Sequence, residues 1–203
     1  MIEIAENFHG DACGGAFCRG RAEKGEAVVT NFWNVKKGYW KVDFKIISAD
    51  SKYLQAVLLL LGRGFKGSVY TCGKRVKKPK GAFACIAIWE YCNPREFSFY
   101  VENKEGDFGI SNGLSSYNII SGKTAEEPLG FCSRIVGGMA MIPVKKGEAC
   151  FRMNCNDMEF DDDFSDLVFD VRFTETETKE EWEKLAKTPS AYEIKMYESP
   201  KPQ

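Results

Sequence analysis

The chain has 203 residues, of which 28 are Lys or Arg and 29 are Asp or Glu, so its formal net charge is −1. This balance gives no overall electrostatic field to attract nucleic acid or an anionic membrane, and it disfavours both as partners. A hydrophobic content of 44% excludes a disordered chain, and the single histidine, His9, leaves little scope for imidazole catalysis.

The first 25 residues combine five glycines with two cysteines and several charges, which predicts an irregular arm. The arm begins with acidic residues and has no long apolar segment, so it does not resemble a signal peptide. We therefore expect a cytoplasmic or virion location. In such a compartment the eight cysteines are expected to be reduced and to pack as small apolar side chains.

Two other roles for the cysteines stay open, a disulfide framework and a zinc site. Disulfides need a secreted context, which the N-terminal sequence does not indicate. Structural zinc prefers cysteine pairs separated by two to four residues. Two pairs have the spacing Cys-x4-Cys, with His9 four residues before the first of them: Cys13/Cys18 and Cys150/Cys155.

Short apolar segments with a period of two begin at residue 26 and predict β-strands. The segment 27–33 is rich in β-branched and aromatic residues, which favour strands. The segment 39–46 alternates most strictly and predicts a half-buried antiparallel strand. Its core-facing and solvent-facing sets are Trp40, Val42, Phe44 and Ile46 against Lys41, Asp43 and Lys45.

Further strands are expected at 54–61, 65–72, 83–91, 97–101, 131–141, 149–153, 167–173 and 192–197. Gly62–Gly67 matches the pattern G-x-G-x-x-G, but a strand rather than a helix is expected after it. We therefore interpret it as a glycine-rich hairpin turn. The stretch 106–122 contains many glycines and is predicted to be rich in loops around Tyr117. Gly137–Gly138 predicts a bend or bulge within its strand.

One helix is predicted near the C-terminus. Thr178 and Glu181 have the spacing of a capping box, in which each side chain satisfies a main-chain amide of the other. Pro189 is expected to end the helix. Favourable i, i+4 ion pairs and a short apolar stripe support it: Glu180/Lys184 and Glu183/Lys187, then Trp182, Leu185 and Ala186.

About ten short strands followed by one short C-terminal helix predict an all-β fold, an antiparallel β-sandwich or barrel. No alternation of strands and helices is visible, which disfavours a parallel α/β sheet. The predicted division is an arm at 1–25, a β-sandwich domain at 26–175, and a helix, strand and tail at 176–203.

Two charged clusters interrupt the strands. The basic cluster is interpreted as a solvated hairpin tip, or as a contact for an acidic partner surface or a nucleic-acid backbone. It comprises Lys74, Arg75, Lys77, Lys78 and Lys80. The acidic run 157–166 is interpreted as a solvated loop, with Asp161 and Asp163 as candidate cation ligands. It lacks the glycine and glutamate positions of an EF-hand.

Two echoed segments, Val35–Gly38 and Val144–Gly147, both read Val-Lys-Lys-Gly and each lies before a predicted strand. The second, within 137–148, resembles the strand and turn of tumour-necrosis-factor/C1q-like jelly-roll modules, in which a P-x-K-x-G-D/E turn follows an apolar strand. The resemblance covers about 26–173 in strand order. It implies a jelly-roll-like sandwich of the kind used in phage and viral structural proteins, usually as trimers, and supplies no catalytic residues.

We therefore expect a non-enzymatic module of a virion or another assembly, without a cofactor or membrane segment, that contacts protein neighbours or surface glycans. The candidate binding residues are Trp33, Tyr39, Lys74, Arg75, Lys77, Lys78 and Tyr117. The alternatives are a hydrolytic, for example carbohydrate-active, enzyme that uses carboxylates within Asp161–Asp166, and a lectin-like or zinc-stapled scaffold.

Overall fold

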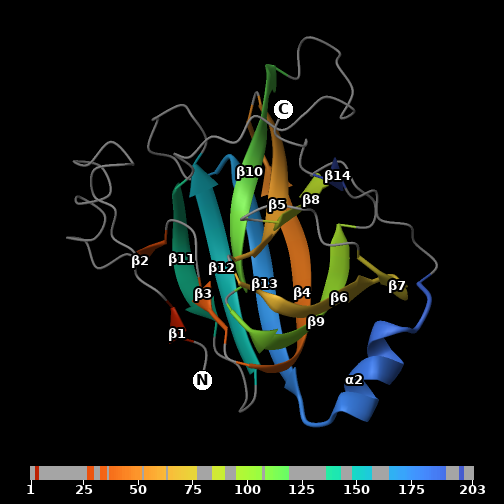
Figure 1. Ribbon diagram of the computed structural model, residues 1–203. Helices are drawn as coiled ribbons and strands as arrows, with labels where there is room; N and C mark the ends of the chain where they lie inside the picture. Colours follow the sequence, from red (N-terminus) through yellow and green to blue (C-terminus); the bar gives the residue numbers. More distant parts are fainter. Residues whose placement is uncertain are drawn as a thin grey trace.

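The computed structural model describes the strands, the C-terminal helix and the shorter connections. The described residues are 3–4, 27–29, 33–35, 37–51, 53–62, 64–76, 84–89, 95–106, 108–118, 136–142, 148–156, 165–190 and 197–198. Figure 1 shows the strands in two layers, with the helix α2 (Lys179–Ala186) beside the larger sheet. The chain is thus an all-β antiparallel sandwich with one short described helix, which confirms the predicted fold class.

The larger sheet has eight strands, in the order β2 (Ala27–Val29), β11 (Val136–Ile142), β12 (Glu148–Asn156), β13 (Leu167–Thr176), β4 (Gly38–Ala49), β9 (Glu96–Glu105), β6 (Lys66–Thr71) and β7 (Lys74–Arg75). The smaller sheet has four, in the order β10 (Phe108–Asn118), β5 (Tyr53–Leu61), β8 (Ala84–Trp89) and β14 (Tyr197–Glu198). Two further short strands pair with each other, β1 (Glu3–Ile4) and β3 (Trp33–Asn34).

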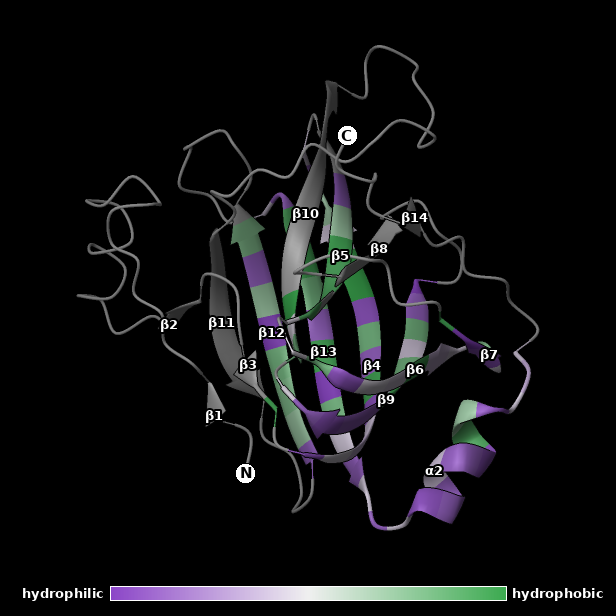
Figure 2. Cartoon of the chain, viewed as in Figure 1, coloured by the Kyte–Doolittle hydropathy of each residue, from purple (hydrophilic) through white to green (hydrophobic). Residues whose placement is uncertain are grey.

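The hydrophobic core lies between the two sheets. Strand β4 supplies the four core-facing side chains predicted from its alternation, and all are buried. Phe44 stacks on Phe97 with ring centroids 5.1 Å apart and meets Phe99 edge to face at 5.8 Å. Such pairs add about 0.5–1.5 kcal/mol beyond the burial of their area. Figure 2 shows the same alternation of polar and apolar residues along β4 and β13.

Strand β5 is buried on both faces, because consecutive residues 55–59 are all shielded from solvent. This burial explains the uninterrupted apolar run in the sequence, which by its period alone fits a buried strand or a helical turn. Gln55 is the polar exception, and its Nε2 donates to Ser51 Oγ at 3.1 Å.

Three predictions about connections were wrong. Gly62–Gly67 does not close a hairpin, because β5 and β6 belong to different sheets and the segment carries the chain between them. The stretch predicted to be loops contains β10, whose glycines pair in register with β5 and so gain main-chain hydrogen bonds. Gly137–Gly138 forms no bulge, because the register with β12 is unbroken from Val136 to Ile142.

Helix α2 begins and ends as predicted. The amide of Glu181 donates to Thr178 Oγ1 at 3.2 Å, and Glu183 forms the expected ion pair with Lys187 at 2.9 Å. The apolar stripe is wrong at Leu185, which is 38% exposed, because the helix rests on the sheet through Trp182 instead. Within the described ranges this eight-residue helix is the only one, and none has the length and hydropathy of a bilayer span.

Candidate functional site

The predicted binding and metal residues do not form one described cluster. Tyr39 lies beneath α2, with its ring centroid 5.7 Å from that of Trp182. Lys74 and Arg75 are exposed on the two-residue edge strand β7. Trp33 lies in β3 and Tyr117 in β10, where strand positions alone are described. The remaining candidates lie outside the described residues: Lys77, Lys78, His9, Cys13, Cys18, Asp161 and Asp163.

The outer face of the eight-stranded sheet, which is turned away from the smaller sheet, carries charged side chains in rows. One row crosses four strands through directly opposite residues and alternates in sign: Arg152, Asp170, Lys45 and Glu96. The next row contains Cys150, Arg172, Asp43 and Ser98. Opposite charges placed directly across neighbouring strands attract each other, so the register of the sheet sets this pattern.

The first row forms close ion pairs at its two ends. Lys45 Nζ lies 2.6 Å from Glu96 Oε1. The guanidinium of Arg152 donates twice to Asp170, at 2.8 and 2.9 Å. The hydrogen bond to Glu96 raises the pKa of Lys45, and the hydrogen bond to Asp170 raises the pKa of Arg152. Because the pairs are exposed, we expect them to set the charge pattern of the face more than its stability.

The second row holds a carboxylate with two donors. Asp43 Oδ1 lies 2.9 Å from Lys41 Nζ and accepts a hydrogen bond of 2.5 Å from Ser98 Oγ. Ser98 belongs to the central strand β9, while both Lys41 and Asp43 come from the neighbouring strand β4. The contact therefore fixes the hydroxyl of Ser98 on the outer face.

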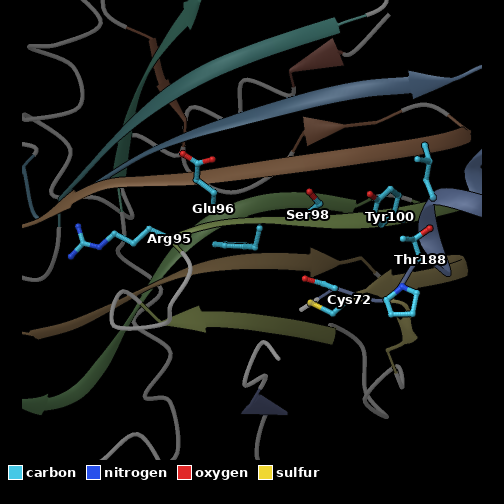
Figure 3. A pocket seen from close by; sticks show the side chains of 10 residues that line it. Cys72, Arg95, Glu96, Ser98, Tyr100 and Thr188 are labelled. Atoms are coloured by element: carbon cyan, nitrogen blue, oxygen red, sulfur yellow. The ribbon is translucent and has the colours of Figure 1, made fainter. Parts of the chain in front are cut away.

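Two adjoining hollows lie on this face, and they share Glu96, Phe97 and Ser98 of β9. Their volumes are about 720 Å³ and about 430 Å³. We call the two hollows together the β9 trough. Figure 3 shows the larger one, with Glu96, Ser98 and Tyr100 following one another along β9. The volumes fall in the range of small-molecule sites, about 300–1,000 Å³.

The wall at the Tyr100 end comes from α2 and from the turn between β6 and β7. This turn has two residues with positive φ, Cys72 at 50° and Gly73 at 75°, as a type I′ hairpin requires. A methyl group on Gly73 would meet the main chain of Pro189 and Thr188, so glycine allows the turn and the end of the helix to touch. The exposed Leu185 also lines this end.

Tyr100 stands half-buried in the trough, and burial raises the pKa of its phenol above the usual value of 10.0. A tyrosine whose pKa is raised on folding contributes stability below about pH 10, and this contribution is lost as the pH rises through the folded-state value. The neutral hydroxyl is therefore the form present near pH 7, and it can both donate and accept a hydrogen bond.

We predict that the phenolate absorbance of the folded chain contains a component that titrates above pH 10.0 and disappears in Tyr100→Phe. The measurement is a spectrophotometric pH titration of both proteins. If the late component is unchanged in the variant, Tyr100 is not the shielded phenol.

Three cysteines among the described residues are free thiols, as expected for reduced cysteines. Cys72, Cys150 and Cys155 are free, and burial raises the pKa of Cys155 strongly. Groups of three or more potential metal ligands are absent from the described ranges.

Asp166 contradicts the predicted solvated acidic loop, because it is buried and its main-chain carbonyl accepts a hydrogen bond from the amide of Asp50 at 3.1 Å.

Sequence reasoning missed Ser98, Tyr100 and Leu185 as site residues. The first two alternate with Phe97 and Phe99 in a segment whose pattern predicts a strand, so their shared face could have been inferred. The contribution of Leu185 from α2 could not have been inferred, because nothing local in the sequence places the helix beside β9.

No protein-family model, curated protein or solved structure matches this chain.

Proposed function

We propose that the chain is a non-enzymatic structural and binding module whose binding surface is the β9 trough. One observation carries the proposal: three segments far apart in the sequence meet around a hollow that presents polar side chains from one central strand. Glu96, Ser98 and Tyr100 follow one another along β9 (Figure 3), and Leu185 also lines the hollow. A concave surface with a few convergent polar groups is the usual form of a binding site.

The carboxylates of the trough are paired with cationic side chains, an arrangement that suits a binding surface. In the trough, Asp43 has Lys41 beside it, Glu96 has Lys45, and Asp170 has Arg152. These pairs hold charged groups of both signs in fixed positions along the trough, which suits recognition of a ligand with several polar groups.

The enzyme alternative relies on carboxylates within the acidic run. Its last member, Asp166, is buried at the start of β13, while Asp161 and Asp163 lie outside the described residues. Burial keeps Asp166 away from a substrate, so this member of the run does not support the enzyme alternative.

We further propose that the chain is a component of a virion or another assembly. Its trough would contact a protein neighbour or a surface glycan. The support for this extension is the resemblance of 137–148 to tumour-necrosis-factor/C1q-like jelly rolls, together with the antiparallel sandwich. The native mass in solution tests it, because a module of this kind is expected to form oligomers.

The proposed site is tested with two ligand libraries, a glycan array and a displayed peptide library, each screened with three proteins. The proteins are the unaltered chain, Leu185→Glu and Ile47→Glu. Leu185 and Ile47 are both 38% exposed, but Leu185 lines the trough and Ile47 lies on β4 outside it. The same charge is thus added at two equally exposed positions.

We expect at least one ligand whose affinity falls by about tenfold or more in Leu185→Glu, a loss of about 1.4 kcal/mol, and is kept in Ile47→Glu. Ligands that bind both variants with the same affinity as the unaltered chain would show that the trough is not the site. The absence of ligands from both libraries would also count against a binding role.

A further inference from the structure

We propose that the β9 trough binds a neutral oligosaccharide, an inference that rests on the proposed binding role of this surface. The trough carries side chains of both charges. Four cationic and three anionic side chains line the two hollows, so neither sign dominates: Lys41, Lys45, Arg95 and Arg172 against Asp43, Glu96 and Asp170. A mixed surface of this kind produces no field that would select an anionic or cationic ligand.

Strand β9 lies inside the sheet and offers little free main chain to a ligand. It pairs with β4 from Glu96 to Asn103 and with β6 from Tyr100 to Glu105, and the carbonyl of Ser98 accepts a hydrogen bond from Thr71 Oγ1 at 2.9 Å. An extended peptide gains affinity from a run of main-chain hydrogen bonds to a free sheet edge. On β9 only residues 96–99 lack a strand partner on the β6 side, so recognition in the trough depends mainly on side chains.

The side chains of the trough keep hydrogen-bonding capacity beyond their ion pairs. Lys45 carries three N–H donors and Glu96 has two carboxylate oxygens, and the ion pair between them joins one atom of each. The hydroxyl of Tyr100 can donate and accept. Saccharide hydroxyls also act in both ways, so a mixed row of donors and acceptors suits them.

The end of the trough opposite Arg95 is partly apolar. Tyr100 and Thr188 lie at this end (Figure 3), and Leu185 and Pro189, which are close to Thr188 in the chain, also line the hollow. Sugar rings present C–H groups on one face and hydroxyls around the rim. One ring can therefore rest on this apolar end with its hydroxyls near Ser98, while the next ring reaches Glu96, about 13 Å from Tyr100 along the strand. A peptide anchor, in contrast, requires a deep and fully desolvated apolar pocket.

The experiment measures the affinity of the full chain for neutral oligosaccharides (the hexamers of the maltose, cellulose, mannan and chitin series) and for a sulfated heparin fragment. Two variants alter the trough, Tyr100→Ala and Ser98→Ala. The matched control is Ser48→Ala, an exposed serine on β4 that does not line the trough. Thermal unfolding verifies that each variant is folded, and Ser98→Ala keeps the test valid if Tyr100→Ala does not fold.

We expect one of the neutral series to bind, with a loss of about tenfold or more in each trough variant and less than about twofold in Ser48→Ala. The affinity is expected to stay constant between about 50 and about 500 mM salt, because screening does not act on a neutral ligand.

Three results would overturn the inference. Binding of heparin alone, weakened by salt and by the trough variants, would leave the trough as a site but for an anionic ligand. Binding of peptides alone at the trough would support the proposed binding role but contradict a saccharide as the ligand. Neutral saccharides that bind all variants equally would show that the trough is not their site.

The reaction of Cys72 with iodoacetamide gives an independent readout. Cys72 is a partly exposed free thiol in the trough, whereas Cys150 and Cys155 are buried. The bound oligosaccharide is expected to slow alkylation of Cys72 at least about threefold, with little reaction of the buried thiols. An unchanged rate for Cys72 at saturating saccharide would contradict occupancy of this end of the trough.

Discussion

Replacing Trp182 with alanine is expected to lower the free energy of unfolding by about 3–5 kcal/mol. The side chain is 2% exposed, and its indole N–H donates to the carbonyl of Trp40 at 3.2 Å. Its ring centroid lies 5.7 Å from those of both Tyr39 and Tyr70. Alanine would remove these contacts and leave a cavity between α2 and the sheet.

The same substitution is expected to weaken ligand binding, because Trp182 holds in place the helix that supplies one wall of the trough. Urea denaturation followed by circular dichroism measures the stability. Trp182→Phe is the control, since it keeps a ring and loses the hydrogen bond, at a cost of about 1–2 kcal/mol. A loss below about 1 kcal/mol in Trp182→Ala would show that α2 does not depend on this contact.

The second large effect is expected from Gly67→Ala, with a loss of about 3 kcal/mol or more. A Cβ at this position would overlap the carbonyl oxygen of Glu102 on β9. The neighbouring strand has little freedom to move, because Asn103 Nδ2 donates to the carbonyls of Val35 and Gly106 at 2.9 and 3.2 Å. The added methyl group would therefore clash with main-chain atoms that are held in place.

Gly64→Ala is the matched control for this substitution. Gly64 has a φ of +84°, but no atom lies within 4 Å of the position that a methyl group would take, so alanine there adds backbone strain alone. We expect a cost of about 1–2 kcal/mol from that strain. Equal urea midpoints for the two variants would contradict the close approach of β6 to β9.

The strands of this fold could be predicted from the sequence wherever the environment is half-buried. Strand β4 has one face in the core and one in solvent, and its alternation from Trp40 to Ile46 reflects both. Helix α2 could be predicted because its cap and its ion pairs are local, as Thr178 and Glu183 show. In both cases the signal lies within a few residues of the structure that it predicts.

The sheet order and the glycine-rich segments could not be predicted, because they depend on partners far away in the chain. The sequence neighbours β5 and β6 read as a hairpin around Gly62–Gly67, yet β5 pairs with β10 and β8. Strand β10 has no strong pattern of its own, and pairing with β5 stabilises it. Propensity is a weak guide where pairing on both sides decides the structure.

The candidate site, like the fold, could be predicted only where its sequence signal is local. The alternation of β4 predicts the polar face of Lys41, Asp43 and Lys45, and this face forms one side of the β9 trough. The opposite wall depends on contacts between α2 and distant strands, and on a turn in which Cys72 has positive φ. Pairing and docking over long sequence separations create the site, so residue patterns alone point to one wall of it.

The most direct test of the central claim, that the β9 trough is the binding surface, is a map of amide chemical shifts during titration with the tightest ligand from either library. We expect the largest shifts at 95–100, at Cys72 and at 185–190, with small shifts along the core-facing strand β5. Shifts that cluster on another surface and leave 95–100 unchanged would contradict it.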